Sequence, residues 1–194
     1  MRFNITLLIF GLCSILSVIG VASGSKKNKI DKVNSEIFSY VYQKIGSIRL
    51  MRGGNVECYN EFIPLINNLA TKARDNSKIC VNNASEEKDK ELIATNSRRA
   101  EVEIEVAKIT KYYADCSVHN VGLDYFNCLS GNADYSIRNM ENTTAKVREI
   151  LRDYYEHIDE IEQAEKNCLN GSVEKAKSDT DKAFDDLKIC LIST

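Results

Sequence analysis

Proline is almost absent from this chain, since Pro64 is the single one in 194 residues. Helices are therefore rarely broken by proline, and the abundance of Glu, Lys, Ala, Ile and Leu favours helix nearly throughout. Support for β-strands is correspondingly slight. The sequence thus predicts an all-α fold.

Charge of one sign is also lacking, because 26 basic residues stand against 28 acidic ones. They form no basic stripe and no acidic tract, which excludes an obvious nucleic-acid-binding face and a disordered acidic tail. No segment after Val21 is apolar enough to span a bilayer. We therefore expect neither nucleic acid nor, once the first segment is removed, a membrane among the partners.

The first 24 residues have the organisation of a secretory signal peptide. Arg2 supplies a short basic start, residues 3–21 are almost continuously apolar, and small residues follow. Cleavage after Ala22 or Gly24 would satisfy the small-residue rule for processing. An N-terminal membrane anchor is the alternative, because the apolar run approaches the ~20 residues that span a bilayer. The boundary residues favour the signal peptide, so we expect a secreted, extracellular protein.

Removal of this segment also removes Cys13 and leaves an even number of cysteines. An even number in an oxidising compartment indicates a disulfide framework rather than a reactive thiol. The six that remain are Cys58, Cys80, Cys116, Cys128, Cys168 and Cys190.

Apolar residues recur at steps of three and four along several stretches, which is the period of helices with one apolar face. The longest such stripe is Ile137, Met140, Thr144, Val147, Leu151, Tyr154, Ile158 and Ile161. Asn-rich residues 81–87 and Asn170-Gly171 are typical of helix ends, and Pro64 of a helix start. The sequence predicts a disulfide-stapled antiparallel hairpin or bundle of about five helices, over 30–51, 60–80, 86–116, 132–168 and 172–191.

These elements divide the chain into three parts. We expect a signal peptide over 1–24, an N-terminal amphipathic helix with a Gly53-Gly54 linker over 25–57, and a six-cysteine helical domain over 58–191. The interruptions in the helical pattern favour outer helices that fold back into a bundle over outer helices that continue straight.

The cysteine separations of 22, 36, 12, 40 and 22 residues read almost the same backwards. A chain folded about Gly122 places Cys80 and Cys168 at matching levels, about 54 and 60 Å from the turn at 1.5 Å per residue. This symmetry favours the nested pairs Cys58–Cys190, Cys80–Cys168 and Cys116–Cys128. Six cysteines allow 15 connectivities. One alternative joins Cys58 to Cys80 and Cys168 to Cys190, which would need each outer segment to double back within 22 residues.

Three sequons fit an extracellular protein: Asn83-Ala-Ser, Asn142-Thr-Thr and Asn170-Gly-Ser. Two of them coincide with predicted helix breaks, where an asparagine would be exposed. We therefore expect glycosylation at one or more of Asn83, Asn142 and Asn170.

Cys116, His119 and Cys128 form the most suggestive cluster for chemistry. A zinc site needs four ligands, and only three are offered. A nucleophilic Cys–His pair needs a thiolate, which a disulfide-bonded cysteine lacks. His119 is more simply a polar loop residue and His157 a solvated helix residue. We expect no catalytic, cofactor-binding or metal-binding residue, and no enzyme.

Acidic stretches such as EVEIEVAK and EHIDEIEQAE mostly fall outside the apolar stripes, as solvated helix faces do. Glu165 lies within a stripe, and a core-edge ion pair is its simplest role, with a ligand contact as the alternative. The pairs Tyr112-Tyr113 and Tyr154-Tyr155 each place one ring in a stripe and one beside it. Core packing is expected for them, with the lining of a small apolar pocket as the alternative.

Several of these runs resemble the TsetseEP domain family of insect secreted proteins. They are ECYNEFIPLINNLA, the segment ADCSVHNVGLDYFNCLSGNADYSIRNMENTTAKVREI, the segment YYEHIDEIEQAEKNCLNGSVEKA and the closing LKICL. The resemblance covers about Cys58 to Leu191 and rests on the cysteine spacing, Phe126 and Cys190-Leu191. It implies an extracellular insect protein, with relatives associated with the gut and with immune challenge, and no known catalytic residue or cofactor. The family's glutamate-proline tail is absent from this sequence.

Two functions follow as expectations. The first is a secreted binding protein of gut or haemolymph that recognises an unknown protein through its surface. Such a protein needs an exposed apolar or aromatic patch on the N-terminal helix or at the turn between Cys116 and Cys128. The alternative is a carrier of a small lipophilic ligand, which needs an apolar cavity of about 300 Å³ or more between the helices.

Overall fold

The computed structural model describes residues 22–48, 56–119 and 122–193 of the chain. These residues form three helices: α2 (Ala22–Ile48), α3 (Val56–Cys116) and α4 (Leu123–Ser193). Within the described ranges no strand occurs, so the all-α prediction is confirmed. The signal peptide's apolar run and the Gly53-Gly54 linker lie outside the described residues.

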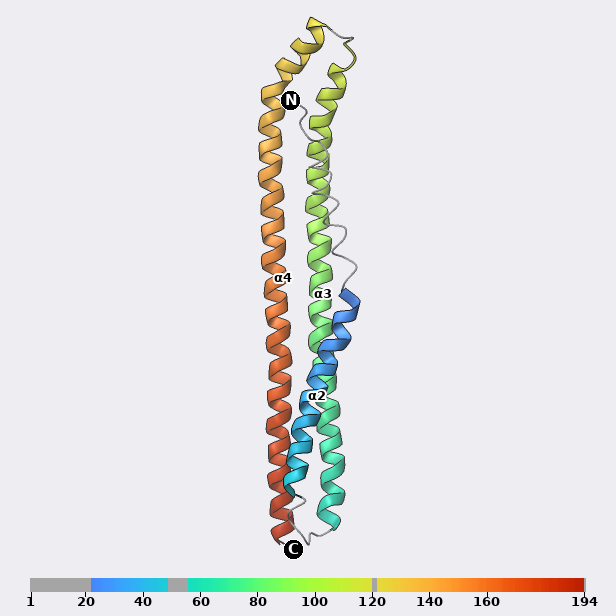
Figure 1. Cartoon of the computed structure of the whole chain (residues 1–194), viewed down its shortest axis with the longest axis vertical. Helices are drawn as coiled ribbons and strands as arrows, with labels where there is room; N and C mark the ends of the chain where they lie inside the picture. Colours follow the sequence, from blue (N-terminus) through green and yellow to red (C-terminus); the bar gives the residue numbers. More distant parts are fainter. Residues whose placement is uncertain (1–21, 49–55, 120–121, 194) are drawn as a thin grey trace. The chain divides into compact units, whose positions relative to one another are not determined.

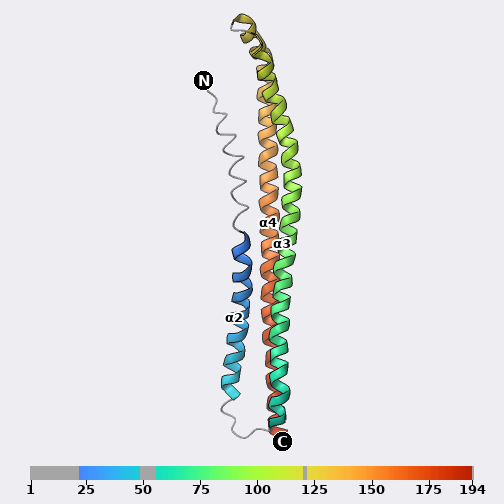
Figure 2. The same ribbon diagram turned by 90° about the vertical axis from the view of Figure 1, so that its right-hand side faces the viewer.

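The described helices fall into two compact units. Unit 1 holds α2 together with residues 56–83 of α3 and 165–193 of α4, and unit 2 holds residues 84–116 of α3 and 123–164 of α4. In each unit the α3 and α4 segments lie side by side and antiparallel (Figure 1). Figure 2 shows the same elements after a quarter turn.

The prediction of about five helices is wrong, because three helices account for the described residues. The predicted breaks at Asn82-Asn83 and Asn170-Gly171 both lie inside unbroken helices. Gly or Asn inside a helix costs up to ~1 kcal/mol relative to Ala. Val81 and Val173, at the two sites, are buried, and burying such a side chain contributes about 1.5–3 kcal/mol. Packing therefore outweighs the local preference, and both helices run through the predicted breaks.

Pro64 is likewise not near the start of its helix, because α3 begins at Val56. Cys58 and Phe62, which precede it, are buried in unit 1. That burial extends the helix through the proline, whose ring removes one backbone hydrogen bond. Pro64 is itself exposed.

Unit 1 is a three-helix assembly with a continuous apolar core. Val41 of α2 packs there with Phe62 of α3 and Phe184 of α4, and the two phenyl rings meet edge to face with centroids 4.7 Å apart. A second cluster joins Val33 and Ile37 of α2 to Val173 and other side chains. Apolar side chains of residues 62–73 in α3 and 173–187 in α4 thus supply this core together with α2.

Unit 2 is a two-helix hairpin with few buried apolar side chains. In this unit they are Ala84, Val102, Ile109, Cys116 and Ile150. Polar contacts join the helices as well: Arg98 binds Asp153 at 3.0 Å, and Lys88 binds Glu162 at 2.6 Å. His157, predicted to be a solvated helix residue, is exposed and lies 3.0 Å from Glu91.

Three disulfides staple the antiparallel pair, and they join the cysteines in the nested order that the spacing favoured. Cys58–Cys190 and Cys80–Cys168 lie in unit 1, and Cys116–Cys128 closes unit 2. Their Cα–Cα distances of 6.0, 5.8 and 5.6 Å suit a disulfide. None of the described helices is long and apolar enough to cross a membrane.

Candidate interaction surface at the disulfide-closed tip

The tip of unit 2 is the short connection between the end of α3 at Cys116 and the start of α4 at Leu123. Ser117 caps the end of α3, since its backbone N–H and its hydroxyl both donate to the Ala114 carbonyl, at 3.1 and 2.6 Å. The backbone N–H of Phe126 donates to the carbonyl of Gly122, the residue at the predicted pivot. These bonds satisfy backbone groups that helix ends leave open.

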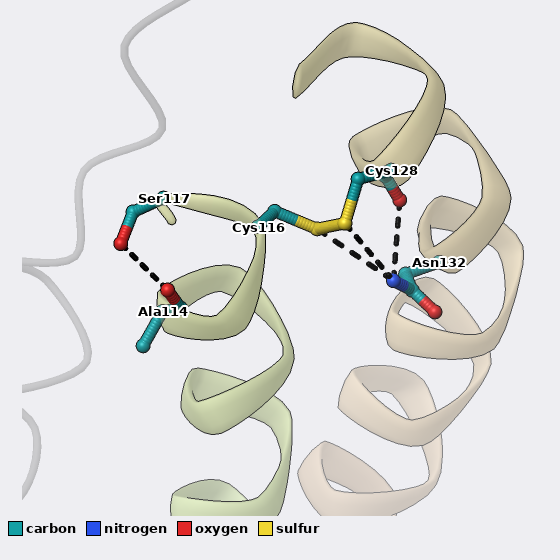
Figure 3. The surroundings of a disulfide bond; sticks show 5 residues. All are labelled: Ala114, Cys116, Ser117, Cys128 and Asn132. Atoms are coloured by element: carbon teal, nitrogen blue, oxygen red, sulfur yellow. Dashed lines mark hydrogen bonds between the residues drawn. A yellow bond between two sulfur atoms is a disulfide. The ribbon is translucent and has the colours of Figure 1, made fainter. Parts of the chain in front are cut away.

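The Cys116–Cys128 bridge forms the base of this tip. Cys116 is fully buried, and the side-chain nitrogen of Asn132 donates to the Cys128 carbonyl at 3.1 Å. The same nitrogen lies 3.7 and 3.9 Å from the two sulfurs, as Figure 3 shows. Asn132 therefore fixes the first turns of α4 against the bridge. Sequence reasoning missed this residue, because an asparagine in a helix carries no pattern of its own.

Above this base the tip exposes large apolar side chains. Val118, Leu123 and Phe126 are 79%, 77% and 65% exposed. The Tyr125 ring meets the Phe126 ring edge to face, with centroids 5.7 Å apart. These exposed apolar side chains beside a disulfide make the tip the candidate interaction surface, because exposed apolar patches are typical of interaction sites. We call Val118, Leu123 and Phe126 the tip patch.

His119, the third member of the Cys116/His119/Cys128 cluster, is exposed at the tip. Both cysteines are disulfide-bonded and therefore offer no thiolate. Among the described residues no group of three or more His, Cys, Asp or Glu side chains is placed to hold a metal ion. The disulfide therefore leaves no Cys–His nucleophilic pair at the tip.

The N-terminal helix α2 carries a smaller exposed aromatic pair, Phe38 and Tyr42. Its polar residues mainly attach it to α4. The Tyr40 hydroxyl donates to Asp181 at 2.7 Å, and the ammonium groups of Lys44 and Lys177 lie 5.4 and 5.8 Å from the centre of the Tyr40 ring. Hydrogen bonds from Lys44 and then Tyr40 lower the pKa of the Asp181 carboxyl. No sequence motif pointed to this cluster.

Glu165 takes the role of a core-edge ion pair. Its buried carboxylate binds Lys29 of α2 at 2.8 Å. Of the adjacent tyrosine pairs, Tyr154 is half-buried and Tyr113 is exposed. Tyr112 instead packs edge to face on Tyr135 at 5.0 Å.

Two hollows of unit 1 are small or polar. One has a volume of about 500 Å³ and lies open against α2; it is lined by Lys32, Ser35, Glu36, Ser39, Tyr40, Gln43 and Lys177. The other has about 130 Å³ between α3 and α4, beside Leu69 and Ala176. Neither combines apolar walls with the volume that a lipophilic ligand needs.

The predicted acceptor residues Asn83, Asn142 and Asn170 are all exposed. Two of them lie inside continuous helices rather than at breaks, so the reason given for their exposure was wrong. Glycosylation at these sites stays a prediction.

Comparison with known proteins agrees with the resemblance noted from the sequence. The chain is 29% identical over 192 residues to Protein TsetseEP of Glossina morsitans morsitans, an alignment that covers 93% of this chain and 57% of that protein. The chain thus spans little more than half the length of this relative. No solved structure matches this chain.

A family model described as "Protein of unknown function (DUF725)" matches residues 54–174. This range contains all of α3, the turn, α4 as far as Glu174 and five of the six paired cysteines. The match covers well over half of the chain. The protein therefore belongs to the TsetseEP-like family whose model is described as "Protein of unknown function (DUF725)".

Proposed function

We propose that this chain is a secreted, disulfide-stapled helical protein that acts by binding another protein through its tip patch. The proposal rests on the exposure of Val118, Leu123 and Phe126 next to the Cys116–Cys128 bridge in the sequence, where the bridge joins the end of α3 to the first turns of α4. The bridge joins the two helix ends that carry the patch, and a covalent constraint of this kind lowers the entropy cost of binding. Binding rather than catalysis is the role, in a gut or haemolymph fluid where disulfides persist.

Secretion itself is supported by the three disulfides, which are typical of oxidising compartments. Association with an immune response is a narrower form of the same proposal. It predicts that the partner of the tip patch is more abundant in fluid from challenged animals.

The carrier function has less support than the binding function. A lipophilic ligand would need about 300 Å³ of apolar space, whereas the hollow between α3 and α4 measures about 130 Å³. Native mass spectrometry of the protein purified from its source fluid distinguishes the two, because a carrier would retain lipid in its native ions.

The tip patch is tested with two charged variants of the full, oxidised chain. Phe126→Asp places a carboxylate in the patch, and Ile93→Asp places one at an exposed apolar site of α3, away from the tip. We expect a partner captured from source fluid to be retained by the wild type and by Ile93→Asp, and to be lost from Phe126→Asp. Equal retention by both variants, or no partner for the wild type, would contradict the proposal.

A further inference from the structure

The α4 helix of unit 2 carries two stripes, and only one of them faces α3. Ser136 and Ile150 are buried against α3, and Asp153 and His157 bind α3 side chains. A second stripe lies one residue after the buried positions Ser136 and Ile150. Its members follow one another at intervals of three, four or seven residues. We call this second stripe the α4 seam; it consists of Ile137, Met140, Thr144, Leu151 and Tyr155.

The seam is open to solvent although it is largely apolar. Ile137, Met140 and Tyr155 are 52%, 38% and 59% exposed, and Leu151 is half-buried. The periodicity of the sequence predicted that most of these residues belong to the apolar, buried face of the helix. In unit 1 a third helix, α2, adds its apolar side to α3 and α4, but in unit 2 none of the described residues supplies a third helix. A seam with helical spacing is the surface that another helix buries.

The charged residues beside the seam favour a second copy of the chain as its binding partner. Glu141 and Arg148 lie seven residues apart on one side of α4, with Thr144 near their midpoint. Neither makes an ion pair within the described part of the chain. A copy of the seam that runs antiparallel about Thr144 sets Glu141 against Arg148, and two-fold symmetry repeats the pair. A parallel copy would instead place this side of the two helices on opposite edges of the interface, where Glu141 and Arg148 could not meet.

The same register pairs the apolar residues. About a two-fold axis at Thr144, Ile137 of one copy comes level with Leu151 of the other, and these contacts also occur twice. We propose that the α4 seam is the interface at which two copies of this chain pair antiparallel, forming a four-helix bundle from two unit 2 hairpins. This surface is separate from the tip patch, so the inference goes beyond the proposed function.

The size of the surface suits such a pairing. Two-fold symmetry about Thr144 extends the seam over residues 133–155, about 33 Å of helix at 1.5 Å per residue. In the proposed four-helix bundle the adjoining side of α3 lies in the interface beside the seam, so the paired face is two helices, or about 20 Å, wide. This gives about 660 Å² per copy and about 1,300 Å² in total, within the ~1,200–2,000 Å² of stable interfaces.

A glycan at Asn142 would leave the seam free. Asn142 follows Met140 by two residues, which turns its side chain about 200° around the helix axis at 3.6 residues per turn. Asn142 is exposed on that other side. The proposed interface therefore suits both the glycosylated and the unglycosylated chain.

The first experiment measures mass by native mass spectrometry and by light scattering after gel filtration, on the full oxidised chain at micromolar concentration. We expect a dimer for the wild type and a monomer for Ile137→Lys, with the dissociation constant raised by at least about tenfold, since an unpaired buried charge is costly. Ile93→Lys is the matched control, because Ile93 is exposed on α3, and it should remain a dimer. Helical circular dichroism checks that each variant folds.

The second experiment tests the antiparallel register with charge swaps. Glu141→Arg and Arg148→Glu should each weaken the dimer by about two- to tenfold, because each swap opposes like charges at exposed positions. The double swap should restore it, since the two residues then exchange roles across the two-fold axis. A monomeric wild type, a control that dissociates like Ile137→Lys, or a double swap without rescue would each overturn the proposal. A seam that binds only a different protein would do so as well.

Discussion

At the scale of single residues, Gly171 is a glycine that helix α4 does not need. It lies inside α4, and no atom stands within 4 Å of the position that a Cβ would occupy. We expect Gly171→Ala to raise the free energy of unfolding by about 0.5–1 kcal/mol, because alanine loses less conformational entropy in a helix. Urea unfolding measures it. Gly131→Ala, also in open space within α4, is the matched second variant, and no gain in either would contradict the prediction.

The buried hydroxyl of Ser136 lowers the stability of the folded state. It is fully buried, and its hydroxyl has no hydrogen-bond partner among the described residues. Ser136→Ala should therefore raise the free energy of unfolding by about 1 kcal/mol, since a buried unsatisfied hydroxyl costs ~1–3 kcal/mol. Ser172→Ala is the contrast, because that buried hydroxyl donates to the Ala73 carbonyl at 3.2 Å. Thermal unfolding of both variants should shift in opposite directions, and a loss of stability in Ser136→Ala would refute the assignment.

Asp153 makes the stability of unit 2 depend on pH. Hydrogen bonds from Arg98 and then Arg152 lower the pKa of its carboxyl below the ordinary 3.8. The folded state therefore gains stability that is present above pH ~3.8 and is lost as pH falls through the lowered pKa. Asp153→Asn should be less stable than the wild type at pH 6, and the two urea midpoints should converge near pH 2.

The control for this pH effect is Asp159→Asn, which changes an exposed carboxyl that makes no ion pair with the described residues. Its urea midpoint should follow that of the wild type at both pH values. A gap between wild type and Asp153→Asn that stays constant from pH 6 to pH 2 would show that the ion pair with Arg98 is not the cause.

At the scale of helices, the structure contains the disulfide pairs that the cysteine spacing favoured, but it lacks the helix breaks that the sequence predicted. The symmetric separations led to the pairing that α3 and α4 adopt, because two antiparallel helices with equal rise bring symmetric positions to the same level. The breaks at Asn82-Asn83 and Asn170-Gly171 did not occur. Capping preferences are worth about 1 kcal/mol, and they describe a chain without its packing partner.

The pairing is testable by a tryptic map of the unreduced protein. Cys116 and Cys128 both lie in the peptide 112–138, which should contain its own bridge. Peptide 53–72 should be linked to 189–194, and 79–88 to 167–175. Both members of the last pair contain a sequon, so glycosidase treatment of that linked species should lower its mass if the sites are occupied. A species that links 53–72 to 79–88 would contradict the nested order.

At the scale of the whole molecule, the two units differ in how much apolar surface they bury. Unit 1 holds both apolar clusters and two disulfides, whereas unit 2 has five buried apolar residues. We expect amides in 56–83 and 165–193 to exchange with deuterium more slowly than those in 84–111 and 134–164, because local opening follows local packing. Mass spectrometry of dilute protein measures this.

Measurements at several protein concentrations separate the effect of dimer formation from the effect of packing within each unit. If two copies pair through the α4 seam, protection in 134–164 should rise with protein concentration in the wild type and stay constant in Ile137→Lys. Faster exchange in unit 1 than in unit 2 for dilute Ile137→Lys would refute the difference in packing.

The sequence by itself determined the helical class, the antiparallel pairing and the resemblance to the family. These depend on composition, periodicity and spacing, which are properties of the chain alone. Tertiary structure decided where the helices end and which apolar residues are covered. Asn170-Gly171 stays helical because Val173 and Ser172 are buried against other helices, and the stripe from Ile137 to Tyr154 is divided because a helix in a two-helix unit can bury only one face. The open seam and the tip patch are the consequences, and neither is visible until the packing partners of each residue are known.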